Sequence, residues 1–151
     1  MTELRFVDSN VLVYRHARDE TAKRKRADSI LGALWRERIG RVSDQVLHEF
    51  YVVATRKIAR PVAPEVARKE VRLLERWSPI PGSAALRESA WRLEDRFGLS
   101  WWDALIVAAA QAAKCRYLLS EDFGDGQDYE GVLVIDPFSR DPAELGLDLR
   151  D

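Results

Sequence analysis

Apolar residues follow two alternating patterns along the chain, short unbroken runs and longer stretches with helical spacing. The short runs are too brief for helices and predict strands at 4–7, 41–43, 116–119 and 132–136. The longer stretches place apolar residues three and four positions apart and predict helices at about 11–17, 20–37, 44–58, 64–77, 83–97 and 100–114. The segment 78–81 carries two prolines, each of which removes a ladder donor, so it predicts only a short edge strand.

Strands that alternate with helices favour a mostly parallel sheet with helices on both faces, joined by right-handed crossovers. The sequence therefore predicts an α/β fold, a three-layer α/β/α sandwich around a short sheet of about five strands. A length of 151 residues fits a single domain over 1–151, with a core at about 4–138 and a polar tail after 139.

Composition narrows the class of protein. Hydrophobic residues make up 46% of the chain, which is typical of a globular protein and argues against disorder. The 25 acidic and 24 basic residues nearly cancel, so binding of a polyanion would depend on local clusters of bases. One such cluster is a candidate for contacts to RNA phosphates, with a solvated helix face as the alternative. It consists of Arg15, Lys23, Arg24, Lys25 and Arg26.

The single cysteine and the lack of export or membrane patterns indicate a reducing compartment such as the cytoplasm. Cys115 has no partner for an internal disulfide, and its place at the end of an apolar helix predicts a core position. The N-terminal residues do not form a signal-peptide pattern, and the longest apolar run, 104–110, is far shorter than a membrane-spanning helix. We expect a cytoplasmic protein with no membrane segment.

Two acidic residues directly follow predicted strands. Asp8 comes after the first strand, and Asp122 comes after the strand at 116–119. In a doubly wound sheet these two strands can be neighbours, and ligands bind at the carboxyl ends of such strands. For Asp8 the alternative role is a helix cap alone, because Asp, Ser and Asn are preferred N-cap residues.

Two further acids, Glu49 and Asp103, lie near the starts of helices whose first turns belong to the same rim of the sheet. Apolar neighbours flank Glu49 on its helix face, where a carboxylate needs a cation or a donor; the alternative is pairing with Arg56 or Lys57. Asp103 is an isolated charge on an otherwise apolar helix, and the alternative is a capping box with Ser100. A capping carboxylate can also face a cleft, so the two roles are compatible.

Carboxylates that converge in this way imply a cation. They repel one another, and one would become protonated unless a cation lies between them. Oxygen ligands alone suit Mg²⁺ or Mn²⁺ rather than zinc, since His16 and His48 are isolated and are expected to be structural or surface residues. A cation held by carboxylates lowers the pKa of bound water and neutralises charge on phosphorus, which predicts phosphoryl chemistry.

Four segments together resemble the PIN-domain ribonucleases, and in particular the VapC toxins of VapBC toxin–antitoxin pairs. They are FVDSNVL at 6–12, VLHEF at 46–50, WDALI at 102–106 and LLSED at 118–122, and the resemblance covers about residues 4–138. It implies a metal-dependent endoribonuclease that hydrolyses RNA phosphodiester bonds with Mg²⁺ or Mn²⁺. Its acidic residues would be Asp8, Glu49, Asp103 and Asp122, with Asp8 and Asp103 as the principal metal ligands.

The resemblance also implies supporting residues and partners. Asn10 and Ser120 would orient the metal ligands. Glu121 and Asp125 stay open as alternatives to Asp122 for the fourth acid, because the register of this segment can shift. Members of the family typically form homodimers and are inhibited by a cognate antitoxin protein whose tail enters the active-site groove. The apolar helix segments 50–53 and 71–74 are candidates for the dimer surface, or equally for the core.

Two other classes of protein fit part of the pattern. Aspartyl-phosphate phosphatases also place Asp after the first strand, but they need a second acid two residues later, where this chain has Asn10. A non-catalytic PIN-like module that binds RNA or a protein is the alternative function, and metal binding would distinguish it from an enzyme.

Overall fold

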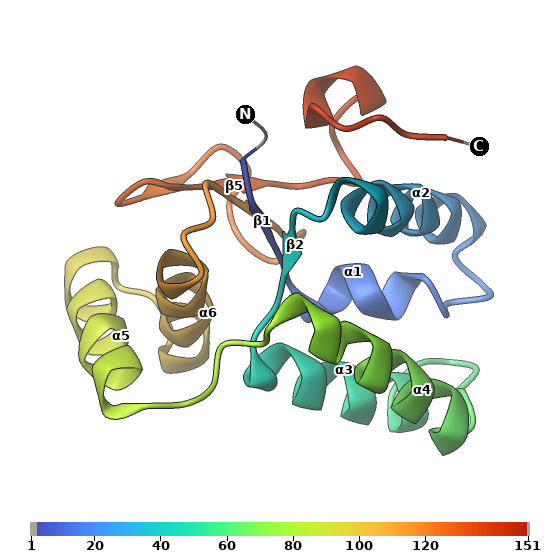
Figure 1. Cartoon of the computed structure of the whole chain (residues 1–151), viewed down its shortest axis with the longest axis horizontal. Coiled ribbons are helices and arrows are strands. Elements are labelled where there is room, and N and C mark those ends of the chain that lie inside the picture. The colour runs from blue at the N-terminus through green and yellow to red at the C-terminus, as the bar shows by residue number, and fades with distance from the viewer. Residues whose placement is uncertain (1–2, 151) are drawn as a thin grey trace.

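The computed structural model describes residues 3–150 and contains a five-stranded sheet between two groups of helices (Figure 1). The strand order is β2-β1-β3-β5-β4. The strands are β1 (Arg5–Val7), β2 (Gly40–Arg41), β3 (Tyr117–Leu119), β4 (Asp128–Tyr129) and β5 (Val132–Ile135). All neighbouring pairs are parallel except β4 with β5. Asp8 follows β1 and Asp122 follows β3. Because β1 lies directly beside β3, the prediction that these two strands are neighbours is confirmed.

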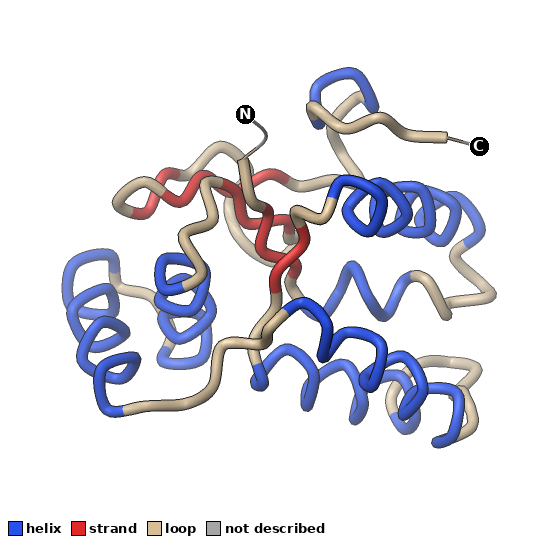
Figure 2. Tube along the Cα trace, in the orientation of Figure 1, coloured by secondary structure: helices blue, strands red, loops and turns tan. Residues whose placement is uncertain are grey.

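Helices cover both faces of this short sheet, as Figure 2 shows. Those before β3 are α1 (Ser9–Tyr14), α2 (Thr21–Glu37), α3 (Asp44–Arg56), α4 (Pro64–Leu74), α5 (Ala84–Phe97) and α6 (Trp101–Ala112). Two 3₁₀ turns, η1 (Glu75–Trp77) and η2 (Pro142–Leu145), complete the elements. Helix α6 packs on β3 and β5 with α5 outside it, whereas α1 to α4 pack together on the other side. The predicted three-layer α/β/α fold is confirmed.

Polar residues set the helix starts close to the predicted positions. The hydroxyls of Ser43, Ser83 and Ser100 cap α3, α5 and α6 by accepting backbone N–H bonds at 3.3, 3.0 and 3.2 Å. Such caps satisfy backbone donors that have no partner inside the helix. Asp103 lies in the first turn of α6 and Glu49 in the second turn of α3, so these two caps also fix where those acids lie.

The core is continuous through the sheet and the inner helices. Phe6 on β1, Leu118 on β3 and Ala110 on α6 are fully buried, and Cys115 is buried as expected. The buried part reaches past residue 138, since Leu145 in η2 packs on the domain and its carbonyl accepts a bond from Arg5. None of the helices in 3–150 combines the length and the apolarity needed to cross a bilayer.

The fifth strand is not the one predicted. Segment 78–81 contributes only an isolated bridge between Ile80 and Ser43, because its prolines cannot donate to a ladder. The fifth strand is β4, at the end of a region predicted as loop, and it forms a hairpin with β5. Glu130 and Gly131 make the two-residue turn, both with positive φ, at 53° and 99°. Two positive φ angles are typical of the tight turn whose twist matches a hairpin.

Candidate active site

Asp8 occupies the carboxyl end of β1 and is 5% exposed. Its Oδ1 accepts a bond from the Ser9 backbone N–H at 2.7 Å, which caps α1. Its Oδ2 accepts a bond from the Ser120 hydroxyl at 2.7 Å, and Ser120 directly follows β3. Each oxygen therefore has its own partner, and Asp8 caps the helix while it also faces the neighbouring strand end.

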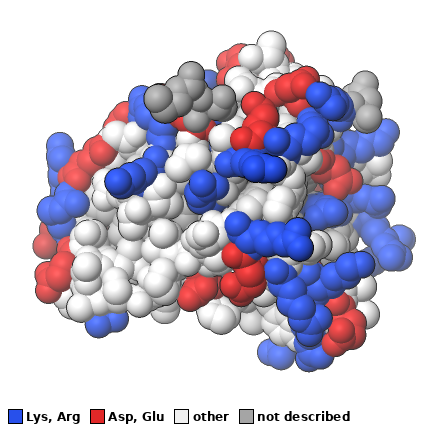
Figure 3. Space-filling model, viewed as in Figure 1, with Lys and Arg blue, Asp and Glu red and all other residues white. Residues whose placement is uncertain are grey.

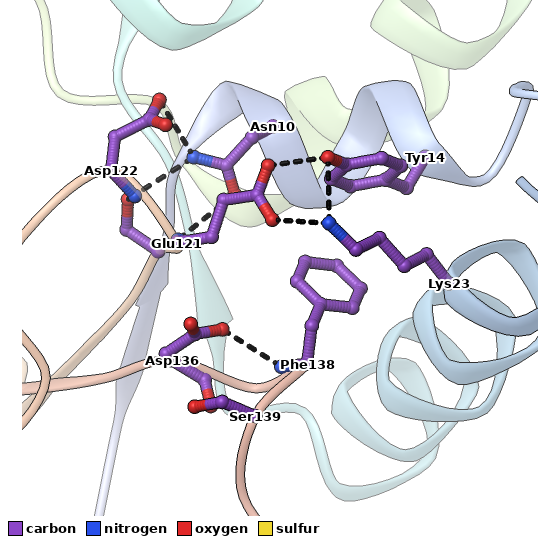
Figure 4. Close-up of polar contacts among 9 residues, drawn as sticks. Asn10, Tyr14, Lys23, Glu121, Asp122, Asp136, Phe138 and Ser139 are labelled. Atoms are coloured by element: carbon purple, nitrogen blue, oxygen red, sulfur yellow. Dashed lines mark hydrogen bonds and ion pairs between the residues drawn. The ribbon is translucent and has the colours of Figure 1, made fainter.

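The amide of Asn10 joins the two strand ends (Figure 4). Its Nδ2 donates to the Ser120 hydroxyl at 3.1 Å and to Asp122 Oδ2 at 3.2 Å, with a longer contact of 3.4 Å to Asp8 Oδ2. The backbone N–H of Asp122 donates to the same Ser120 hydroxyl at 3.1 Å. Asn10 and Ser120 thus fix the position of Asp122 relative to Asp8.

Glu49 is held by two polar neighbours. Its Oε2 accepts a bond from the Ser9 hydroxyl at 3.2 Å, and its Oε1 accepts one from Gln45 Nε2 at 3.0 Å. Gln45 Nε2 also lies 3.2 Å from the carbonyl oxygen of Trp102, next to Asp103. Among the described residues Glu49 forms no ion pair with Arg56 or Lys57, so the alternative pairing considered above does not occur.

Electrostatic effects connect all four acids. The pKa of Asp8 is raised to about 6, mainly by burial. The charges of Glu49 and Asp122 also raise it, whereas the bonds from Ser120 and Ser9 lower it. Burial also raises the pKa of Asp103, and the charge of Asp122 adds to this effect while Ser100 opposes it. The structure therefore brings the acid cluster, defined as Asp8, Glu49, Asp103 and Asp122, into one region at the carboxyl edge of the sheet.

The two alternative acids point elsewhere. Glu121 accepts bonds from the Tyr14 hydroxyl and from Lys23 Nζ, the latter at 3.0 Å, and Figure 4 shows both donors directed at its carboxylate. Asp125 pairs with Arg140 Nε at 3.0 Å and accepts the Asp136 backbone N–H at 2.8 Å. Of the three candidates for the fourth acid, Asp122 is the one that lies beside Asp8.

The candidate RNA-contacting bases are largely engaged within the protein. Arg15 pairs with Glu70 at 2.6 Å and with Asp28 at 3.2 Å. Arg26 donates to the carbonyls of Pro137 and Arg140, and Lys23 is bound to Glu121. Arg24 and Lys25 are exposed on α2. The run of four bases is therefore not a free cationic surface.

Gln45 and Ser9 are the site residues that the sequence analysis missed. Gln45 lies four positions before Glu49, a spacing that places two side chains on the same helix face. Ser9 is the first residue of α1, and its hydroxyl, next to Asp8, reaches across to Glu49. Both signals are present in the sequence, but each becomes specific only when α1 and α3 are known to pack together.

The donor set of the acid cluster fits a hard divalent cation. All four side chains offer carboxylate oxygens, the ligands that Mg²⁺ and Mn²⁺ prefer. The raised pKa of Asp8 reflects burial and uncompensated negative charge, which a cation would relieve. Within 3–150, no three His, Cys, Asp or Glu side chains are close enough together to hold an ion as they stand. Binding would therefore require the carboxylates to move closer together.

The fold and the acid cluster define a single-sheet α/β/α protein with an acidic site where β1 and β3 end. The family model for the PIN domain matches residues 5–124, and the chain belongs to this family. The resemblance inferred from the four sequence segments is confirmed at the level of the family.

Solved structures with low sequence identity share the fold. A toxin–antitoxin complex from Klebsiella pneumoniae is 21% identical with a TM-score of 0.62, covering 88% of this chain and 97% of that chain. VapC20 of Mycobacterium tuberculosis, a toxin that cleaves the sarcin–ricin loop, is 17% identical with a TM-score of 0.53, covering 78% and 91%. FitAB bound to a DNA fragment is 14% identical with a TM-score of 0.69, covering 91% and 98%. A comparison with curated proteins gave no match.

Proposed function

We propose that this protein is a metal-dependent endoribonuclease that hydrolyses RNA phosphodiester bonds, and that it is the toxin of a type II toxin–antitoxin pair. The observation that supports this proposal best is the acid cluster at the carboxyl edge of the sheet, in which Asp8 is buried and feels the charges of Glu49 and Asp122. A buried carboxylate beside other acids is costly without a compensating cation, and the place of the cluster matches the usual ligand-binding edge of an α/β sheet.

The four acids would together bind Mg²⁺ or Mn²⁺. Asp8 and Asp103 are the principal ligands, and Glu49 and Asp122 complete the set. When bound, the cation supplies a water of lowered pKa and neutralises charge at the scissile phosphate. The protein fixes the carboxylates: Ser120 orients Asp8, Asn10 holds Asp122, and Gln45 holds Glu49.

The proposal includes partners and a compartment. The protein acts in the cytoplasm, as a homodimer that a cognate antitoxin inhibits; one of the similar structures is a toxin–antitoxin complex. Within the candidate dimer segments, Phe50 and Leu74 are buried and belong to the core. Val66 and Leu73 on α4 are 47% and 43% exposed and are better candidates for the dimer surface.

Cleavage of RNA by the purified protein tests the proposal. We expect cleavage with Mg²⁺ or Mn²⁺, and loss of cleavage when EDTA is added. Asp8→Asn and Asp103→Asn should each lower the rate at least a hundredfold, because each removes a charged ligand.

Asp125→Asn is the matched control, since Asp125 is an acid near the same edge whose carboxylate pairs with Arg140. It should cleave RNA like the wild type. Full activity of Asp8→Asn or Asp103→Asn would contradict the assignment. Absence of both Mn²⁺ binding and cleavage in the wild type would instead favour a non-catalytic module that binds RNA or a protein.

A further inference from the structure

A mostly apolar groove opens beside the acid cluster, between α3 and α6. It has a volume of about 640 Å³, within the range of small-molecule sites. Leu86, Leu105 and Ala109 form part of its apolar wall. Residues 78–83, the link that crosses from the α4 side to α5 in Figure 1, contribute Ile80 and Gly82.

Trp102 is the most exposed large hydrophobic side chain described on the protein, at 63%, and it lines this groove. An exposed aromatic side chain on the wall of a mostly apolar groove is typical of a ligand-binding surface. The other tryptophan on α6, Trp101, stacks instead on Trp91 of α5 with ring centroids 5.8 Å apart. Trp102 is thus left without such a neighbour at the position next to Asp103.

The groove is physically continuous with the acid cluster. Glu49 belongs to both, since it lines the groove and contributes to the raised pKa of Asp8. Gln45 bonds to Glu49 Oε1 and to the carbonyl oxygen of Trp102, so one side chain connects the acid to the backbone that carries the indole. A group that packs on Trp102 is therefore held at a fixed offset from the carboxylates.

The charges of the groove select against a phosphate. Its charged lining residues are Asp44 and Glu49, both acidic, with no Lys or Arg among the described residues that line it. Figure 3 shows that Lys and Arg gather over the α2 and α4 side of the molecule, while much of the face near α5 and α6 is uncharged. The occupant must be flat enough to pack on an indole, free of negative charge, and able to donate hydrogen bonds to carboxylates.

We propose that this groove is a nucleobase subsite, in which an unstacked base of the RNA, one that flanks the cleaved phosphate, stacks on Trp102. The proposal rests on the proposed ribonuclease function. Single-stranded RNA is commonly recognised by stacking of splayed bases on aromatic side chains. The amino groups of a base can donate to Asp44 or to the neighbouring acid Glu49, and His48 lines the same wall. An apolar peptide segment offers no side-chain donors to these carboxylates, whereas the amino groups of a base do, so a base fits the lining better.

The test uses short single-stranded RNAs that the wild type cleaves. In each RNA, a single nucleotide, either just before or just after the cut, is replaced by an abasic nucleotide. For the wild type, loss of the base at one position should lower kcat/KM about tenfold or more, the effect typical of one stacked base. Trp102→Ala should lower kcat/KM by the same factor on intact RNA, with no further loss when that base is absent. Trp102→Phe should keep most of the rate.

Trp91→Ala is the matched control, because Trp91 is a second exposed tryptophan, at 45%, and does not line the groove. It should respond to base removal like the wild type. A second readout avoids chemistry: RNA with 2-aminopurine at the sensitive position should lose fluorescence on binding to Asp8→Asn protein, and the Asp8→Asn/Trp102→Ala double variant should not quench it.

The possible failures are distinguishable. If Trp102→Ala slows cleavage equally with and without the base, the indole does not act through the base and the proposal is overturned. If Trp102→Ala cleaves every RNA at the wild-type rate, the proposal is also overturned, and a peptide segment becomes the better candidate occupant of the groove. If the wild type cleaves no RNA with any divalent metal, the ribonuclease function fails and this subsite fails with it.

Discussion

At the scale of single residues, the site is a set of carboxylates held by neutral donors. Ser120, Asn10 and Gln45 contribute hydroxyl and amide groups, and none of them neutralises a charge. By contrast, Glu121 and Asp125, next to the cluster in sequence, both pair with cations. Nearby acids thus have opposite environments, and this difference can be measured through the pH dependence of stability.

Asp8→Asn should stabilise the metal-free protein at neutral pH. The pKa of Asp8 is raised from 3.8 to about 6, so its contribution to stability is fully present below about pH 4 and is lost as the pH rises through 6. The charged form then costs the fold about 3 kcal/mol by linkage, and the neutral amide should recover about 1–3 kcal/mol of it. Urea unfolding in EDTA at pH 4 and pH 7.5 measures this, with the gain expected only at the higher pH.

Asp125→Asn should behave in the opposite way. The pKa of Asp125 is lowered, because bonds from the Asp136 backbone and from Arg140 outweigh its slight burial. Its charge therefore stabilises the fold at neutral pH, and that contribution falls as the pH drops through the lowered pKa. Equal effects of the two substitutions at pH 7.5 would contradict this account of the cluster.

At the scale of elements, the positions of the acids follow from where strands end and helices begin. These boundaries could be predicted because an apolar run followed by Asp8, or a serine before a periodic stretch, is a local signal. The choice among Asp122, Glu121 and Asp125 could not, since it depends on Lys23 and Tyr14, about a hundred residues earlier in the chain. Strand β4 could not be predicted either, because a strand of two residues is too short to show the alternation of apolar and polar residues.

Two helix caps allow effects on the free energy of unfolding to be distinguished from effects on RNA cleavage. Ser100→Ala and Ser83→Ala each remove a hydroxyl cap, and each should cost about 1 kcal/mol of unfolding free energy. Of the two helices α5 and α6, α6 is the one that carries an acid of the cluster, so Ser100→Ala should also slow RNA cleavage several-fold, whereas Ser83→Ala should not. Urea unfolding and initial cleavage rates on the same preparations provide both measurements. Equal cleavage rates would mean that the cap does not position Asp103.

At the scale of the whole molecule, the acidic site and the exposed apolar surface of α4 belong to different parts of the chain. The acids lie where β1 and β3 end, and Val66 and Leu73 lie on α4, which packs on α3. Val66 and Leu73 are seven positions apart and so lie on the same side of α4, which is why we propose this helix as the surface between copies. Such a separation allows association and catalysis to be disrupted independently.

Leu73→Glu should convert the proposed dimer into a monomer. The substitution places a charge on an exposed position of α4 and removes apolar area from the interface, while the buried Leu74 beside it keeps the core intact. Light scattering after size-exclusion chromatography gives the mass directly. Trp91→Glu, an equivalent change at an exposed apolar position of α5, is the control and should leave the mass unchanged. A wild-type protein that is already monomeric would exclude this interface.

The carboxylate of Asp8 has opposite effects on the folding stability of this protein and on its proposed activity. Selection for folding alone would favour an uncharged residue at position 8, because the buried charge lowers stability near neutral pH. Selection for hydrolysis would retain the acid and accept a less stable domain. A mutational scan scored once for abundance and once for activity should therefore rank substitutions at this position in opposite orders.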